Sequence, residues 1–219
     1  MIHCRRRANV QTEAHAILPA RSRRWALWAV LAMTLAAVPA HAQPYVYALG
    51  YEPTPNSAFA RLVAIDASTN GIVGSVVLGE NPAPRNEHLA ISPDGSRIVV
   101  VNNSERTVSV ISAQTLAVLD TYSQALLGIR PAAVTVSSDS RRVYVSGTTP
   151  VNGQDQAFVS VIDIASRSRV GTVPLGTPEA SGLAASPDGS RLYVLTINPQ
   201  TLKIVSTAPT ASSTPCRSA

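Results

Sequence analysis

A six-residue block that recurs along the chain constrains this sequence more than any other feature. The block SPDGSR at 92–97 returns unchanged at 186–191, and a diverged copy, SSDSRR, stands between them at 137–142. The aspartates of the three copies, Asp94, Asp139 and Asp188, are 45 and 49 residues apart. Self-similarity at a period of this size predicts a repeat architecture, in which each unit buries its apolar faces against its neighbours.

Short runs of β-branched and apolar residues follow each block. Runs of this length, rich in Val and Ile and bounded by Gly, Pro, Asn or Asp, are typical of strands, and no convincing 3.6-residue period follows residue 42. Four such runs in a unit of about 45 residues predict the four-stranded blade of a β-propeller. A β-sandwich is the alternative, but a sandwich does not require the same turn at the same offset in every unit. The runs stand at 97–101, 107–111, 142–145, 158–163 and 191–195, with closing runs GSVVLG at 74–79 and GTVPLG at 171–176.

The order of these runs resembles the YVTN-family β-propeller repeat, over roughly residues 44–206. In the places of Tyr-Val-Thr-Asn stand VVVN at 99–102, YVSG at 144–147 and YVLT at 193–196. The resemblance implies an extracytoplasmic propeller, often of about seven blades and usually without an established activity. The wider group includes lactonase-like propellers, so the resemblance also implies a hydrolase as an alternative.

We therefore expect an all-β fold, an incomplete β-propeller of about 3.5–4 four-stranded blades, preceded by an N-terminal signal peptide. Within a repeat region at 43–206, the blades are expected at about 44–79, 87–126, 131–176 and 181–206. A disordered tail rich in Ser, Thr and Pro is expected at 207–219. The repeat stops part-way through a blade, which favours a truncated reading frame; pairing with a second copy and closure as a four-bladed ring are the alternatives.

The first 42 residues are expected to be a leader that is removed. Three arginines within 21–24 precede an apolar run of 14 residues at 25–38, and the sequence AHA at 40–42 offers a small-x-small cleavage site. This arrangement is typical of a secretory signal peptide, with the mature chain starting near Gln43. The apolar run is short for a membrane span, although an uncleaved anchor is the alternative. We expect a periplasmic or extracellular protein without a stable membrane span after cleavage; the export route, general secretory or twin-arginine, stays open.

The positive charge of the chain lies in this leader. The whole chain has a formal net charge of +5, and residues 1–42 hold six arginines and one glutamate. The remainder therefore has 12 basic and 12 acidic side chains, so a nucleic-acid partner is not expected. The two cysteines, Cys4 and Cys216, fall in the leader and the tail, which excludes a disulfide within the mature chain.

The loops that share one face of a propeller are the expected binding surface. These loops join the second strand of a blade to the third, and the fourth strand to the next blade. The second-to-third loops of the first and third blades are six residues longer than the others, and insertions on one face of a repeat array point to a binding surface. Solvated hairpin tips without a partner are the alternative. The candidate binding residues are Glu52, Asn56, Glu80, Arg85, Glu87, His88, Arg130, Gln154 and Asp155.

The sequence predicts no catalytic residue, no metal site and no cofactor. His88 is the one histidine after residue 42, and we expect it to be a solvated loop residue without the partners that a zinc site or a catalytic triad needs. The recurring Asp94, Asp139 and Asp188 are predicted to cap turns. The predicted function is a secreted or periplasmic scaffold that binds a protein, glycan or cell-surface component through its loop face. A lactonase-like hydrolase is the alternative function, and a homo-oligomer could form through open blade edges.

Overall fold

The computed structural model describes residues 45–53, 58–80 and 88–207, and the structural statements below concern these residues. They form strands and connecting turns, with one short helix, α2 (Gln124–Leu127). The expected leader lies outside the described residues, as does the expected tail after Thr207. Thr207 itself is held, because its backbone N–H donates a 3.0 Å hydrogen bond to the carbonyl of Ser190.

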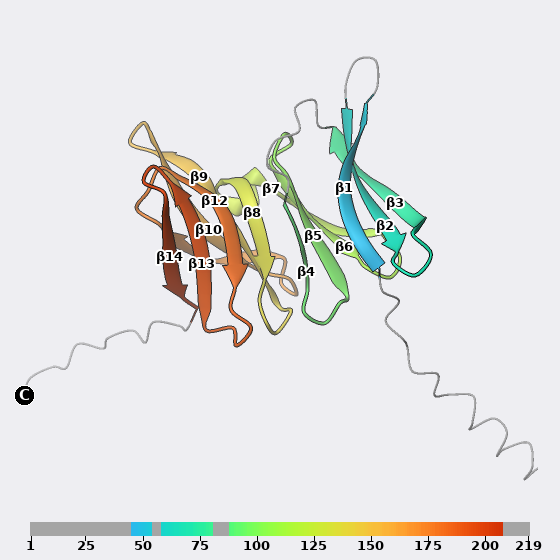
Figure 1. The fold of residues 1–219 in the computed structure, drawn as a ribbon. Coiled ribbons are helices and arrows are strands. Elements are labelled where there is room, and N and C mark those ends of the chain that lie inside the picture. Colours follow the sequence, from blue (N-terminus) through green and yellow to red (C-terminus); the bar gives the residue numbers. More distant parts are fainter. Residues whose placement is uncertain (1–44, 54–57, 81–87, 208–219) are drawn as a thin grey trace, which may run out of the picture. The chain divides into compact units, whose positions relative to one another are not determined.

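The described strands form four antiparallel sheets that follow one another along the chain (Figure 1). Within each sheet the strands pair in chain order, which is the layout of a propeller blade. Blade 1 contains β1 (Tyr45–Pro53), β2 (Ala58–Asp66) and β3 (Gly71–Glu80). Blade 2 contains β4 (Leu89–Ile91), β5 (Arg97–Asn102), β6 (Thr107–Ser112) and β7 (Val118–Ser123). Blade 3 contains β8 (Arg130–Val136), β9 (Arg142–Val151), β10 (Gln154–Asp163) and β11 (Ser168–Pro174). Blade 4 contains β12 (Glu179–Ala185), β13 (Arg191–Ile197) and β14 (Thr201–Ser206).

The core lies between the blades, because the middle strands bury side chains on both of their faces. In β5, Ile98 and Val100 belong to an apolar cluster with Leu62 of blade 1. The alternate residues Val99 and Val101 pack in the opposite direction, in a cluster that includes strands of blade 3. A third cluster joins blade 3 to blade 4. A strand that is covered on both faces has no polar face, which explains the unbroken IVVV run. The predicted all-β, incomplete propeller is confirmed.

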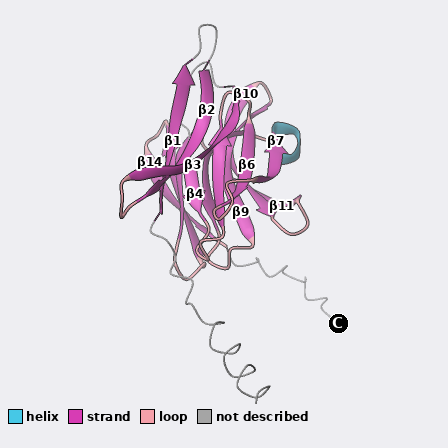
Figure 2. Cartoon of the chain, turned by 90° about the vertical axis from the view of Figure 1, so that its right-hand side faces the viewer, coloured by secondary structure: helices cyan, strands magenta, loops and turns pink. Residues whose placement is uncertain are grey.

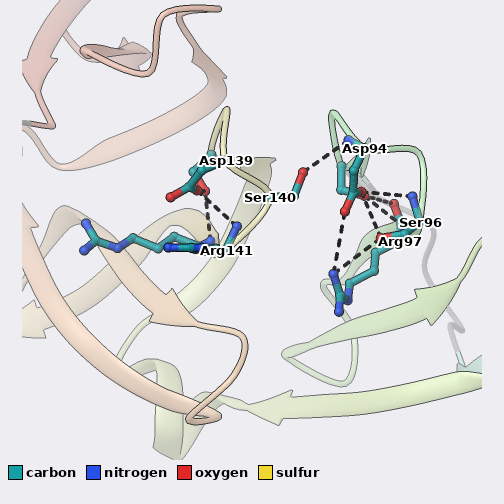
Figure 3. Close-up of polar contacts among 9 residues, drawn as sticks. Asp94, Ser96, Arg97, Asp139, Ser140 and Arg141 are labelled. Atoms are coloured by element: carbon teal, nitrogen blue, oxygen red, sulfur yellow. Dashed lines mark hydrogen bonds and ion pairs between the residues drawn. The ribbon is translucent and has the colours of Figure 1, made fainter. Parts of the chain in front are cut away.

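A repeated turn joins the first two strands of blades 2, 3 and 4. The hydroxyl of Ser92 donates to Asp94 Oδ1 at 2.5 Å and accepts the backbone N–H of Arg97 at 2.9 Å. The same two contacts recur in the turns of the other two blades, where they are made by Ser137, Asp139 and Arg142, and by Ser186, Asp188 and Arg191. Figure 3 shows the turns of blades 2 and 3. The prediction that the repeated aspartates cap turns is confirmed.

A second repeated contact ties each blade to the next one. The carbonyl of a buried leucine near the end of each blade accepts a hydrogen bond from a side chain of the following blade, just before a glycine with positive φ. Such a φ is readily adopted by glycine, so the chain can turn sharply into the next blade. The acceptors are the carbonyls of Leu78, Leu127 and Leu175, and the donors are Asn102 Nδ2, Ser160 Oγ and Lys203 Nζ respectively.

Two elements differ from the sequence-based expectation. The six extra residues of the first and third blades were expected to lie in loops, but in both blades the paired strands are longer than expected. In blade 1, β1 and β2 stay paired out to Pro53 and Ala58, and residues 54–57 lie outside the described residues. In blade 3, β9 and β10 stay paired out to Val151 and Gln154, where Asn152 and Gly153 form a two-residue turn with φ values of 52° and 79°. Asn-Gly with both φ values positive is the preferred turn for a tight hairpin. The other difference is α2, visible in Figure 2, which ends where Gly128 takes φ 72° and donates to the carbonyl of Gln124.

Candidate binding face

The loop face consists of the turns at 103–106, 152–153 and 198–200 and the blade connections at 124–129 and 175–178. The turns join the second strand of a blade to the third, and the connections lead from one blade to the next. Strand direction places both kinds at the same ends of the strands, as the prediction required. The hairpins β1–β2 and β9–β10 also reach this face, with strands of 9 and 10 residues respectively (Figure 1).

Arg130 and Asp155 are the two candidates that the structure joins directly. Arg130 begins β8 and Asp155 is the second residue of β10, and both strands pair with β9 between them. Arg130 Nη2 lies 3.4 Å from Asp155 Oδ1, and the two side chains are 40% and 49% exposed. An ion pair this exposed contributes about 0–1 kcal/mol to stability. Both side chains therefore remain available to a partner.

Of the other two hairpin candidates, Gln154 directly precedes Asp155, whereas Glu52 lies on blade 1. Gln154 begins β10 and is exposed beside the Asn-Gly turn. Glu52 lies near the end of β1 and forms an ion pair with Arg61 of β2, which also donates a 2.8 Å hydrogen bond to Ser75 of β3. The Glu52 carboxylate is therefore engaged across the sheet of blade 1.

Glu80 and His88 flank the connection from blade 1 to blade 2. The backbone N–H of Glu80 donates to Glu105 Oε1 at 2.9 Å, so the blade-2 turn holds the end of β3. His88 is partly buried, and its carbonyl accepts the backbone N–H of Val101 at 2.9 Å. Burial lowers the pKa of His88 below its usual value of 6.5. His88 lies in a loop as expected, but it is partly buried rather than fully solvated, and a backbone hydrogen bond joins it to β5.

Three candidates, Asn56, Arg85 and Glu87, lie outside the described residues. Within the described ranges, no three His, Cys, Asp or Glu side chains gather closely enough to hold a metal ion. Among the described residues, no helix is long and apolar enough to cross a membrane.

Sequence reasoning missed a contact between a turn and the helix on this face. Arg106 Nη1 donates a 3.3 Å hydrogen bond to Gln124 Oε1, which connects the β5–β6 turn to α2. The α2 segment reads SQALLG at 123–128, and glycine directly after a helical turn is a recognised stop signal. That signal could have located α2, but a single turn leaves no helical period to read.

Two hollows in the described part of the chain are lined by residues other than the candidates. A polar hollow of about 210 Å³ lies at the turns opposite the loop face, with Asp139, Arg142 and Asp188 in its lining. Another hollow, of about 630 Å³, lies between β11 and the neighbouring three-stranded blade 4, and its lining includes Val173 and Val205. The candidate face itself is thus a polar surface with hairpins rather than the lining of one of these hollows.

Successive antiparallel sheets whose inner strands β4, β8 and β12 lie side by side define the described chain as a β-propeller. The chain is 38% identical, over 107 residues, to the seven-bladed beta-propeller protein Rv1057 of Mycobacterium tuberculosis. The match covers 48% of this chain and 25% of that relative, so the chain matches about a quarter of the relative's length. No family model matches the chain.

Two solved structures share the fold. The chain superposes on hydrazine synthase of Kuenenia stuttgartiensis with a TM-score of 0.55 and 20% identity, covering 72% of this chain and 45% of that one. It superposes on the Cps50 (Swd1) beta-propeller domain of Myceliophteria thermophila with a TM-score of 0.55 and 16% identity, covering 74% and 54%. Identities this low support the shared fold alone.

Proposed function

We propose that this chain is an exported β-propeller of the YVTN kind, which binds a cell-surface protein or glycan through its loop face. The observation that carries the proposal is the exposed Arg130–Asp155 pair beside the β9–β10 hairpin. Binding residues often stand on projecting segments that a rigid scaffold positions. An exposed ion pair contributes little to the stability of the fold, so both side chains can contact a partner without destabilising the protein.

The shape of this surface favours a macromolecular partner over a small substrate. A small-molecule site is usually a concave pocket with converging polar groups. The described candidates instead lie on strands of a protruding hairpin and on separate blades. The alternative is a lactonase-like hydrolase. Within the described ranges, no three-residue metal cluster is present to support it.

Binding to the loop face can be tested with the labelled full chain on envelope fractions of the source cells and on an array of surface glycans. We expect the combined variant Arg130→Ala, Gln154→Ala, Asp155→Ala to bind at least ~10-fold more weakly, because charged anchors at a polar interface are lost. Arg141→Ala is the matched control, since Arg141 is an exposed arginine of the β8–β9 turn on the opposite face. Unchanged binding by the triple variant would refute the assigned face, and lactone turnover by purified protein would favour the hydrolase.

Export has its own test. Sequencing the N-terminus of the protein recovered from the periplasm or medium should give Gln43 as the first residue, as expected for cleavage after the AHA site. Recovery of the intact leader on membranes would contradict this part of the proposal.

A further inference from the structure

Blade 4 presents an apolar face that no described part of the chain covers. Tyr193 pairs with Ile204 and Leu195 pairs with Leu202 across β13 and β14, so these four side chains share one face. Leu195, Leu202 and Ile204 are 40%, 62% and 58% exposed. The opposite face of the same strands is buried, because Leu192 and Val194 pack against blade 3. We call this exposed set the blade-4 face.

The same positions in the preceding blades are buried by the blade that follows. Tyr144 stands two residues after the arginine that begins β9, as Tyr193 does in β13, and it is only 6% exposed because it packs against blade 4. Val108 and Val110 of β6 occupy the places of Leu202 and Ile204, and they are 0% and 1% exposed. In the preceding blades this face is an interface with the next blade. A surface shaped like another blade should therefore fit the blade-4 face.

Blade 1 presents a second uncovered apolar face, which points the other way along the series of blades. Val46, Ile65 and Ile72 form one row across β1, β2 and β3, and Val77 stands opposite Arg61. Val46, Ile72 and Val77 are 53%, 72% and 45% exposed, within the part of the chain that the structure describes. We call this set the blade-1 face.

The charge on the blade-1 face is already compensated. Arg61 is paired with Glu52 and hydrogen-bonded to Ser75, all within blade 1. The exposed residues named for the blade-4 face are uncharged. Burial of the two faces against each other would therefore bring together aliphatic side chains and one internally neutralised ion pair, and would leave no new unpaired charge.

We propose that two copies of this chain associate, with the blade-4 face of each packing against the blade-1 face of the other. Within the chain, the following face of one blade packs on the preceding face of the next at each of the three junctions. Among the described blades, the blade-4 face and the blade-1 face are each without such a neighbour, and a second copy supplies the missing partner for both. Two such contacts close a two-fold ring of eight blades, which is the upper end of the usual propeller range of about 4–8.

The experiment measures the mass of the full chain in solution by light scattering and sedimentation across a dilution series. We expect a dimer. Leu202→Lys on the blade-4 face and Val77→Lys on the blade-1 face should each weaken dimerisation by about 100-fold or more, because a charge would be buried at both copies of the interface. Val118→Lys is the matched control, since Val118 is also 45% exposed but lies on β7, at the outer edge of blade 2. Circular dichroism checks that each variant retains its strands.

Mixing the two interface variants distinguishes face-to-face pairing from general stickiness. Each variant keeps one intact face, and these two intact faces are complementary. The mixture should therefore form heterodimers through one wild-type contact, at concentrations where each variant alone does not dimerise. A wild-type chain that stays monomeric at all concentrations would overturn the proposal, and would leave the two faces to blades of another polypeptide. Open-ended larger species would also overturn it, since they would show that the contact does not close.

Discussion

The backbone N–H of Asp94 donates a 3.2 Å hydrogen bond to the hydroxyl of Ser140. This contact joins the β4–β5 turn of blade 2 to the β8–β9 turn of blade 3 (Figure 3). Ser140 occupies the place that Gly95 and Gly189 have in the other two copies, and it keeps their left-handed backbone with φ 58°. The diverged copy of the repeat has thus exchanged an unstrained glycine for a serine that links two blades.

The first prediction separates the two effects of Ser140. Ser140→Ala should lower the free energy of unfolding by about 1 kcal/mol, because the hydrogen bond is lost while the unfavourable φ remains. Ser140→Gly should be close to neutral, since relief of a left-handed backbone, worth about 1 kcal/mol, offsets the same loss. Urea unfolding of the three proteins measures both differences. Equal destabilisation by alanine and glycine would show that φ contributes nothing at this position.

A second prediction concerns Gly147, in the middle of β9 and opposite Pro131 near the start of β8. A Cβ atom placed there would lie 2.1 Å from the backbone carbonyl oxygen of Arg130. The pairing of β8 with β9 prevents this oxygen from moving away. Gly147→Ala should therefore destabilise the protein by about 2 kcal/mol or more and displace the start of β8. Gly50→Ala is the matched control, since a Cβ there meets no atom within 4 Å and the variant should unfold at nearly the wild-type urea concentration. Wild-type stability of Gly147→Ala would contradict the close approach of β8 to β9.

The repeat period revealed the blades because the same turn chemistry is required in each of them. Ser92, Asp94 and Arg97 form one hydrogen-bonded unit, so the motif persists wherever that turn is needed. The hairpin β9–β10 was placed correctly, but its extra residues were interpreted as a loop. The polar stretch TTPVNGQDQ has a weak strand signal of its own, and pairing of β9 with β10 determines its conformation.

The candidate site was less predictable than the fold. Arg130 and Asp155 are 25 residues apart and meet because β8 and β10 both pair with β9, a register that the sequence does not display. The backbone contact of His88 was equally invisible, because it depends on Val101 of β5. Turn chemistry is local and can be read from neighbouring residues, whereas surface contacts between strands depend on register.

The last prediction concerns acid stability and the turn of blade 4. Hydrogen bonds lower the pKa of Asp188 from 3.8 to about 2 in the folded protein. The largest effect comes from the hydroxyl of Ser186, and the next from the backbone N–H and hydroxyl of Ser190. The folded pKa lies below the unfolded one, so the stabilisation is fully present above about pH 4 and is lost as the pH falls towards about 2. Asp188→Asn should therefore lower the melting temperature at neutral pH and flatten its decline in acid. Ser186→Ala retains the carboxylate but removes the main donor, so NMR titration should move the Asp188 midpoint back towards 3.8. A wild-type midpoint already near 3.8 would show that the repeated serine does not hold this carboxylate in its charged form.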